Sequence, residues 1–340
     1  MNSRGSFGRK RKGCLSDTNV YVNRRTFLAS TAALTLQHAD AAAEAAIPII
    51  DCHIHLFDPT RPQGVPWPSK TDTALYKPAL MDRYRKTVAG LGIVGAIEVE
   101  ASPWFDDNQW VLDIAAKDKM IVGHIGDLEP DKPAFRQQLD NLHKNPLFRG
   151  IRYGNIWDRD LFAALDKPEF VAGMKAVADA DLVMDSANPN PRLIAALVKL
   201  SDKVPNLRMV LDHLPRIERP TEAAALKAYE ASLRELGKRK LVFAKVSGVA
   251  KKVNGKVPED IAPYKATLDQ MWDVFGEDRL IYGSDWPNSD QWAEYPVELK
   301  IVRAYFATKG QAAGEKYFWK NSLAAYKWVH REAGQPKLKG

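Results

Sequence analysis

A chain of 340 residues, of which 45% are hydrophobic, is long enough to bury a large core in one or two domains. Its formal net charge of +7 is unevenly placed, because residues 1–46 contain seven basic and three acidic side chains and so contribute +4. The remaining +3 is small, and no basic stripe with interleaved aromatic residues follows. These features argue against a nucleic-acid-binding protein.

Residues 1–46 have the composition of a targeting segment. Arg24 and Arg25 precede a short apolar run over residues 29–36, and an alanine-rich stretch with small-residue cleavage options follows over residues 39–46. This order resembles a cleavable twin-arginine signal and predicts export to the periplasm. The alternative is a start site assigned too far upstream, which predicts a cytoplasmic protein. The apolar run is too short to span a bilayer, and we predict no membrane span elsewhere.

Beyond residue 46, apolar stretches of strand length alternate with amphipathic stretches of helical length. The predicted strands cover residues 48–55, 93–100, 120–128, 148–153, 181–185, 206–213, 241–248 and 279–285. The predicted helices cover residues 80–91, 107–117, 132–144, 168–180, 191–204, 222–238, 261–275 and 291–308, and an extra C-terminal helix covers 314–333.

Eight strand–helix repeats without a break in composition predict an α/β fold, a single (β/α)8 TIM barrel over residues 47–335. A doubly wound open sheet is the main alternative. That fold usually carries a glycine-rich phosphate turn after its first strand, where this chain has two histidines. The proline-rich segment 59–68 is too long for a simple turn, so we predict that it folds over the mouth of the barrel.

The first predicted strand ends in two histidines, His53 and His55. Because side chains alternate along a strand, we expect Asp51, His53 and His55 to share one face. Cys52 is then expected to point toward the helices as a small buried hydrophobe. Two adjacent imidazoles can bind a divalent metal or polarise a carbonyl oxygen, but an isolated His-x-His is a weak signal on its own.

The other predicted strands carry further polar residues, and in a TIM barrel the active site collects at the C-terminal strand ends. These residues are Glu98, Glu100, His124, Asp127, Arg149, Arg152, Asp185, Asp212, His213, Lys245, Ser247 and Asp285. We expect three of them to be structural. Glu98 is predicted to pair with Lys245 or Arg149 inside the barrel, His124 to be a hydrogen-bonded core histidine, and Asp212 to support a loop. An inward lysine is costly unless paired, so Lys245 needs a carboxylate or a substrate anion nearby.

Asp285, directly before Trp286-Pro287, has no packing explanation and indicates chemistry. Across the barrel mouth from His53 and His55, its carboxylate could take a proton from water as a general base. Histidine N–H groups, or a metal on the same histidines, could stabilise the charge that develops on an attacked carbonyl. His213 could hold that oxygen, and Arg152 could bind a substrate carboxylate. These roles together predict hydrolysis.

Five segments in chain order resemble the amidohydrolase superfamily. Within it, they are most similar to a branch of TIM-barrel metal-dependent hydrolases that includes 2-pyrone-4,6-dicarboxylate lactonase, L-fuconolactonase and sulfomuconolactonase. The segments are residues 50–55, 149–152, 210–215, 245–248 and 278–287. The similarity runs from about residue 47 to the C-terminus.

The resemblance implies a catalytic set that consists of Asp285, His53, His55 and His213. Asp285 is the expected general base, and the three histidines are expected to polarise the carbonyl. The expected substrate contacts are Arg152, Arg149, Glu100 and Lys245.

The wider superfamily often completes a two-metal centre with a histidine on strand 5 and a carboxylated lysine on strand 4. This chain has Asp185 and arginines in those places, which argues against two metals. The resemblance leaves two possibilities: one divalent ion, Zn or Mn, on His53, His55 and Asp285, or no metal.

The function expected from these residues and the resemblance is that of a lactonase that opens a small, acidic, cyclic substrate. The first alternative is a metal-dependent decarboxylase of an unsaturated or aromatic acid on the same barrel. The second is a barrel that binds a ligand without catalysis. The strand-end residues favour an enzyme, whereas the choice of substrate depends on the resemblance.

Overall fold

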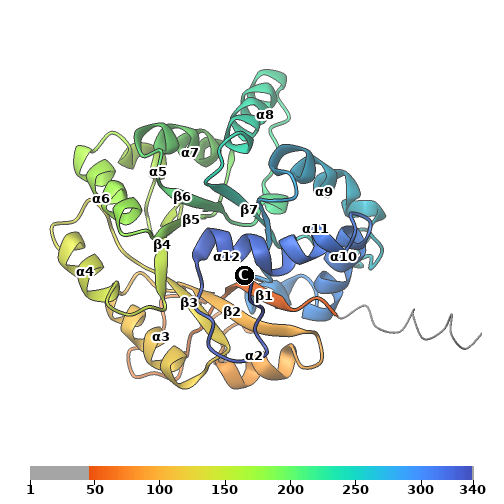
Figure 1. Ribbon diagram of the computed structural model, residues 1–340, viewed down its shortest axis with the longest axis horizontal. Coiled ribbons are helices and arrows are strands. Elements are labelled where there is room, and N and C mark those ends of the chain that lie inside the picture. The colour runs from red at the N-terminus through yellow and green to blue at the C-terminus, as the bar shows by residue number, and fades with distance from the viewer. Residues whose placement is uncertain (1–45, 339–340) are drawn as a thin grey trace, which may run out of the picture. The chain divides into compact units, whose positions relative to one another are not determined.

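A ring of eight parallel strands forms the centre of residues 46–338, the part of the chain that the computed structural model describes. Consecutive strands pair in chain order, and the backbone of His53 and His55 bonds to Asp285 and Trp286 beyond the last strand. Helices surround the ring (Figure 1). The predicted α/β barrel is therefore confirmed in its architecture. The predicted signal covers residues 1–46, and all of it except Ala46 lies outside the described residues.

The elements alternate in the order that the sequence predicts. The strands are β1 (Ile49–Ile54), β2 (Ile93–Val99), β3 (Ile121–Gly126), β4 (Phe148–Gly154), β5 (Val183–Ala187), β6 (Arg208–Leu211), β7 (Val242–Val246) and β8 (Leu280–Tyr282). The helices are α2 (Met81–Thr87), α3 (Phe105–Lys117), α4 (Phe135–Leu142), α5 (Leu161–Ala164), α6 (Pro168–Asp179), α7 (Pro191–Lys203), α8 (Ala223–Gly237), α9 (Ala262–Phe275), α10 (Tyr295–Ala307), α11 (Gln311–Glu315) and α12 (Asn321–Tyr326). None of the helices within residues 46–338 has both the length and the apolar character that crossing a membrane requires.

Several strands end earlier than predicted, and two of these ends change how site residues are placed. β6 ends at Leu211 and β8 at Tyr282, so His213 and Asp285 lie in the loops that follow. Both residues have a left-handed backbone, with φ of 46° and 61°, which is incompatible with a continuing strand. The two side chains are consequently aimed by loop geometry rather than by strand alternation.

A bulge in β1 overturns the expected alternation of its side chains. Asp51 pairs with Ala96 of β2, and Ile54 pairs with Glu98. β1 therefore contains one residue more than β2 between these two pairs. Asp51 therefore faces the helix layer, where its carboxylate accepts hydrogen bonds from Tyr84 and Tyr295. The prediction that Asp51 shares a face with both histidines is wrong for this reason.

The bulge also reverses the direction predicted for Cys52. Its side chain is buried, as expected, but it packs in the interior of the barrel with residues such as Ile50 and Tyr326 rather than against the helices. His53 and His55, beyond the bulge, still point into the barrel toward the loop after β8.

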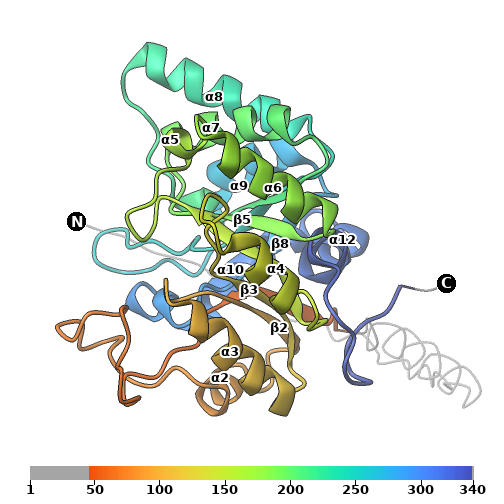
Figure 2. The ribbon, with the colours of Figure 1, turned by 90° about the vertical axis from the view of Figure 1, so that its left-hand side faces the viewer.

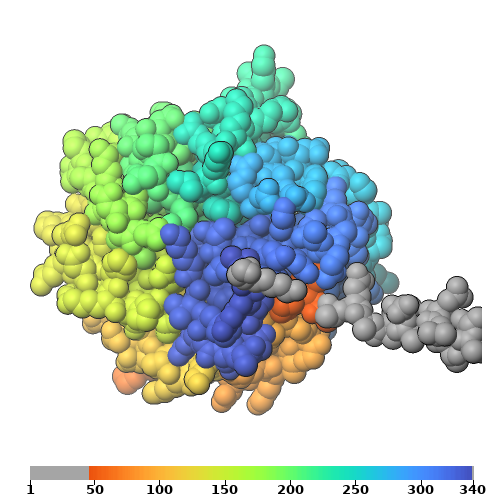
Figure 3. Space-filling model, in the orientation of Figure 1, coloured from red at the N-terminus to blue at the C-terminus, as the bar shows by residue number. Residues whose placement is uncertain are grey.

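The C-terminal segment closes the end of the barrel where the strands begin. The predicted helix over residues 314–333 is interrupted by a π-helical turn (Lys316–Lys320) and ends at Tyr326, because Lys327 is left-handed with φ of 52°. Tyr326 and Trp328 enter the interior cluster. This segment crosses the centre of the face seen in Figure 1 and covers it in Figure 3, and it lies opposite the loop that contains residues 59–68 in Figure 2.

Candidate active site

A cavity of about 440 Å³ opens at the C-terminal ends of the strands. Its lining includes His55, Glu100, Arg152, His213, Arg216 and Asp285. Trp67, from the segment predicted to cover the barrel mouth, also lines the cavity, and its ring centroid lies 5.7 Å from that of His55. The cavity thus collects polar groups from strands that are far apart in the sequence.

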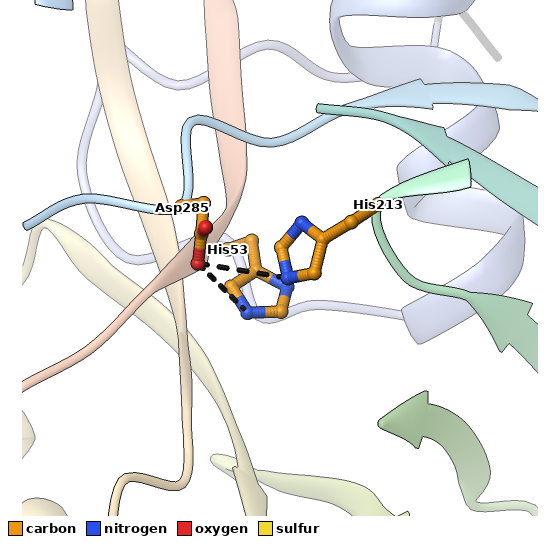
Figure 4. Close-up of side chains that lie close together, drawn as sticks. All are labelled: His53, His213 and Asp285. Atoms are coloured by element: carbon orange, nitrogen blue, oxygen red, sulfur yellow. Dashed lines mark ion pairs between the residues drawn. The ribbon is translucent and has the colours of Figure 1, made fainter. Parts of the chain in front are cut away.

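Three imidazoles converge on one carboxylate oxygen. Asp285 Oδ1 lies 3.4 Å from His55 Nε2, 3.5 Å from His213 Nε2 and 3.7 Å from His53 Nε2. Figure 4 shows His53, His213 and Asp285 pointing toward one another from three different elements. The structure therefore brings together all four residues of the predicted catalytic set, although they span more than two hundred positions.

The second oxygen of Asp285 is anchored. Asp285 Oδ2 accepts hydrogen bonds from Arg216 Nη1 at 2.6 Å and Asn288 Nδ2 at 2.8 Å. Burial raises the pKa of Asp285, but His213, His55 and Arg216 outweigh burial and hold that pKa well below its usual range. Oδ1 itself is buried and has no hydrogen-bond partner among residues 46–338. An ionised oxygen in this state can accept a proton or bind a cation.

The histidines are oriented by their second ring nitrogens. His55 Nδ1 lies 2.7 Å from the carbonyl oxygen of Val99, which can only accept, so His55 carries its proton on Nδ1. His213 Nδ1 lies 2.6 Å from Ser247 Oγ. Burial lowers the pKa of His213 to about 4 and that of His53 well below its usual value, with Lys245 adding to the shift at His53. Both rings are therefore neutral at pH 7.

Lys245 lies beneath the histidines and does not line the cavity. Its Nζ is 2.6 Å from Asp185 Oδ2, 2.9 Å from Asp212 Oδ1 and 3.0 Å from His53 Nδ1, and all four residues are fully buried. The predicted substrate contact for Lys245 is wrong because two carboxylates and a histidine already surround its ammonium. The loop-supporting role predicted for Asp212 is also wrong: its side chain turns inward, toward Lys245 and Arg152.

Arg152 and Glu100 reach the cavity, as predicted. Arg152 Nε donates to Asp212 Oδ2 at 3.1 Å, and its Nη1 lies 3.7 Å from Glu100 Oε1. Glu100 Oε2 accepts hydrogen bonds from Trp157 Nε1 and from the backbone N–H of Ser102. Burial outweighs Arg152 and raises the pKa of Glu100 to about 8, so Glu100 is mainly protonated at pH 7.

Two predicted contacts of strand residues differ in the structure. Arg149 lies near the start of β4, where its Nε donates to the carbonyl of Tyr326 at the closed end of the barrel, so it does not reach the cavity. Glu98 pairs with neither Lys245 nor Arg149; its Oε2 lies 2.5 Å from His124 Nδ1. His124 is the hydrogen-bonded core histidine that the sequence predicts.

Arg216 is a site residue that the sequence did not single out. It ends a 3-10 turn (Leu214–Arg216) directly after His213, and no periodic pattern marks it. In the structure Gly248 makes room for it: Gly248 has φ of +65°, and a Cβ at this position would lie 1.9 Å from Arg216 Nε. The glycine therefore leaves the space through which Arg216 reaches Asp285.

The cluster fits one divalent ion. His53, His213 and Asp285 offer ligand atoms that all lie within 4.8 Å of one another, and no described residue forms a hydrogen bond with Asp285 Oδ1. Nitrogen and oxygen ligands of this kind suit Zn²⁺ or Mn²⁺. The sequence predicted His53, His55 and Asp285 as the ligands, and in this group His213 stands in place of His55. A second group, His53, Asp185 and Asp212, surrounds the ammonium of Lys245.

Comparison with known proteins gives the family. The amidohydrolase family model matches residues 50–328. This chain belongs to the amidohydrolase family. It is 30% identical to an L-fucono-1,5-lactonase of Burkholderia ambifaria over 245 residues, which is 71% of this chain and 80% of that protein. It is 24% identical to a 4-sulfomuconolactone hydrolase of Rhizobium radiobacter, over 70% of this chain and 75% of that protein.

Solved structures of similar proteins have the same fold. A Burkholderia multivorans amidohydrolase with bound zinc superposes with a TM-score of 0.72 at 22% identity, over 83% of this chain and 99% of that one. A 5-carboxyvanillate decarboxylase of Novosphingobium aromaticivorans, in complex with manganese, is more distant, with a TM-score of 0.58 at 17% identity over 84% and 97% of the two chains.

Proposed function

We propose that this amidohydrolase is a lactonase that opens a small cyclic ester. The observation that carries the proposal is the ionised Asp285 Oδ1, buried among three imidazole nitrogens beside a cavity with two arginines. The cavity volume of about 440 Å³ suits a ligand of one or two rings. The names of two relatives, for a fuconolactone and a sulfomuconolactone, support the same reaction class.

The geometry supports direct attack of water on the lactone carbonyl carbon, after which the C–O bond of the ring breaks and the leaving ring oxygen takes the proton that Asp285 has accepted. Asp285 Oδ1 is the general base that takes the proton from water, and Arg216 and Asn288 hold its other oxygen so that Oδ1 faces the histidines. The charge that develops on the lactone carbonyl oxygen is stabilised by N–H donors of the histidine cluster. The neutral state of His53 and His213 at pH 7 means that the carbonyl is polarised by hydrogen bonds rather than by an imidazolium.

The substrate we propose is acidic. Arg152 and Arg216 both line the cavity, and Arg216 Nη2 is buried with no hydrogen-bond partner in the described part of the chain. A guanidinium with a free N–H suits a carboxylate or another anionic group. The protonated Glu100 adds a hydrogen-bond donor for a ring substituent.

A divalent ion, when bound by His53, His213 and Asp285, would supply Lewis-acid polarisation of the carbonyl.

The decarboxylase alternative has weaker support. The similarity to a decarboxylase lies in the fold alone, and the carboxylate of Asp185 on β5 is already paired with Lys245.

The test is a panel of sugar-acid lactones and unsaturated dicarboxylates, offered to metal-analysed protein with and without chelator. Lactone opening is followed by acid release, and decarboxylation by CO₂. We expect acid release from an anionic lactone and no CO₂ from any substrate. Release of CO₂ without lactone opening would overturn the proposal in favour of the decarboxylase.

We also propose that the protein acts after export, on the strength of Arg24, Arg25 and the apolar and alanine-rich stretches that follow. A double Lys substitution at the two arginines should retain the protein in the cytoplasm. Unchanged periplasmic recovery of that variant would contradict a twin-arginine route.

A further inference from the structure

The ammonium of Lys245 lies inside a group of side chains that has the arrangement of a metal site. His53, Asp185 and Asp212 have ligand atoms within 4.8 Å of one another, and Lys245 Nζ lies within 3.0 Å of an atom of each. Lys245 hydrogen-bonds to Asp185 and His53 and forms an ion pair with Asp212. All four residues are fully buried, so no bulk water competes for these contacts.

The contact with Lys245 determines which nitrogen of His53 carries the proton. An ammonium has only donors, so His53 Nδ1 must accept and the proton must be on Nε2. His53 Nε2 lies 3.2 Å from His55 Nε2, and His55 has its own proton on Nδ1, donated to Val99. Every step from Lys245 to Val99 then pairs one donor with one acceptor.

The other tautomer of His53 does not fit these contacts. A proton on Nδ1 would face the Lys245 ammonium at 3.0 Å and could reach only Asp212 Oδ1, at 3.5 Å. It would also leave the Nε2 atoms of His53 and His55 as two lone pairs facing each other at 3.2 Å. Both arrangements are unfavourable in a buried site.

We propose that Lys245 is a positioning residue: a built-in cation that fixes His53 as the Nε2–H tautomer and takes the place of a metal ion beneath the histidines. His53 then presents a proton, not a lone pair, toward His55 and Asp285. Binding of an ion through His53 Nε2 requires this proton to move to Nδ1, which Lys245 opposes. Lys245 thereby biases the cluster toward hydrogen-bond donation.

This inference rests on the proposed lactonase function only for its consequence in the reaction, because the tautomer and the metal affinity can be measured without substrate. A protein that opened no lactone would refute the proposed function and leave the inference standing. A wrong tautomer would refute the inference and leave the lactonase standing.

The first measurement uses the full-length, metal-stripped wild-type protein with ¹⁵N-labelled histidine. NMR of the ring nitrogens, with His53 assigned by comparison with a His53→Asn variant, should show the proton of His53 on Nε2. A proton on Nδ1 would overturn the proposal without any need for a Lys245 variant.

The second measurement compares zinc binding by calorimetry in wild type and in the double variant Asp185→Asn/Lys245→Met. The pair of changes removes the cation together with one carboxylate, so no excess negative charge is buried. His53 can then donate Nδ1–H to Asp212 and bind zinc through Nε2, as in carboxylate–histidine–zinc triads, and we expect zinc affinity to rise about tenfold or more.

Lys300→Met is the matched control, since Lys300 pairs with Glu259 on the surface and should leave zinc affinity unchanged. A folded double variant with unchanged or weaker zinc affinity would contradict the proposal. If the double variant does not fold, the wild-type tautomer decides the matter alone.

Discussion

Two carboxylates of the same cavity have opposite protonation states because their neighbours differ. Asp285 faces three histidines and Arg216, and its pKa lies well below the usual range despite burial. Glu100 has Arg152 only at 3.7 Å, so burial prevails and raises its pKa to about 8. Environments that move the pKa values of two carboxyl groups apart in this way are typical of sites that need both a base and a hydrogen-bond donor.

The raised pKa of Glu100 has a consequence for stability. Above about pH 4.5 the carboxyl is ionised in the unfolded chain, but it stays protonated in the folded protein up to about pH 8. The folded state therefore loses stability as pH rises through this window, and the loss is complete above it. Glu100→Gln cannot ionise, so its free energy of unfolding relative to wild type should increase from about pH 5 to about pH 8 and then level off.

Urea unfolding of both proteins at several pH values checks this prediction. Asp58→Asn, a change at a site outside the cavity, serves as a control for the substitution of a carboxylate by an amide. A pH-independent difference between wild type and Glu100→Gln would show that Glu100 is ionised in the folded protein.

The convergence of the four proposed catalytic residues was predictable from residue type and strand order, but the directions of several other side chains were not. Asp285, His53, His55 and His213 come together because strand ends meet at one rim of a parallel barrel. The direction of a side chain such as that of Asp212 depends on where the strand ends. The apolar pattern does not define that end to within two residues.

Local irregularities of single elements place the reactive groups. The bulge in β1 lets His53 and Cys52 both face the barrel interior, and Asp51 then joins the loop after β8 to α2 and α10 through hydrogen bonds to Ser284, Tyr84 and Tyr295. The sequence of β1 does not reveal the extra residue. The strand is buried on both faces, so its residues show no regular alternation of apolar and polar side chains that a bulge would interrupt.

We predict that the loop after β7 controls the position of Arg216, because Gly248 in this loop leaves the space that the Arg216 side chain occupies. Gly248→Ala places a Cβ 1.9 Å from Arg216 Nε and strains a backbone with φ of +65°, so Arg216 must leave Asp285. We expect kcat/KM for an accepted lactone to fall by about tenfold or more, which corresponds to about 1.4 kcal/mol of lost transition-state stabilisation.

Gly255→Ala provides a matched control. Gly255 has φ of +79°, but no atom of the described residues lies within 4 Å of the position that a Cβ would take. Both variants should lose about 1 kcal/mol of stability from the left-handed backbone, and only Gly248→Ala should lose activity. Equal activity in the two variants would contradict the role given to the glycine.

At the scale of the whole molecule, we expect the stability of the barrel to depend on the C-terminal segment, which closes the end where the strands begin. Trp328 is buried in the interior cluster, and its Nε1 donates to Ser322 Oγ. Gln335 Nε2 donates to the carbonyl of Val94 near the start of β2 and to that of Lys119 just before β3. The eight-fold alternation of strands and helices was readable from the sequence because it is local. The closure was not, because it depends on contacts between the last residues and the starts of distant strands.

Trp328→Ala should lower the free energy of unfolding by about 3 kcal/mol or more, the usual cost of removing a buried large aromatic side chain. Thermal and urea unfolding measure the loss. Trp292→Ala is the control, because Trp292 is 48% exposed and its removal should cost less than about 1 kcal/mol. Similar losses in the two variants would mean that the segment does not support the barrel.

The most direct test of a water-activating carboxylate among three histidines is the steady-state rate of Asp285→Asn on a lactone that the wild-type protein opens. The amide keeps the shape of the side chain but cannot take a proton, so kcat/KM should fall by at least about 100-fold while circular dichroism shows an unchanged fold. A folded Asp285→Asn protein that keeps more than about half of the wild-type rate would show that this carboxylate is not the base.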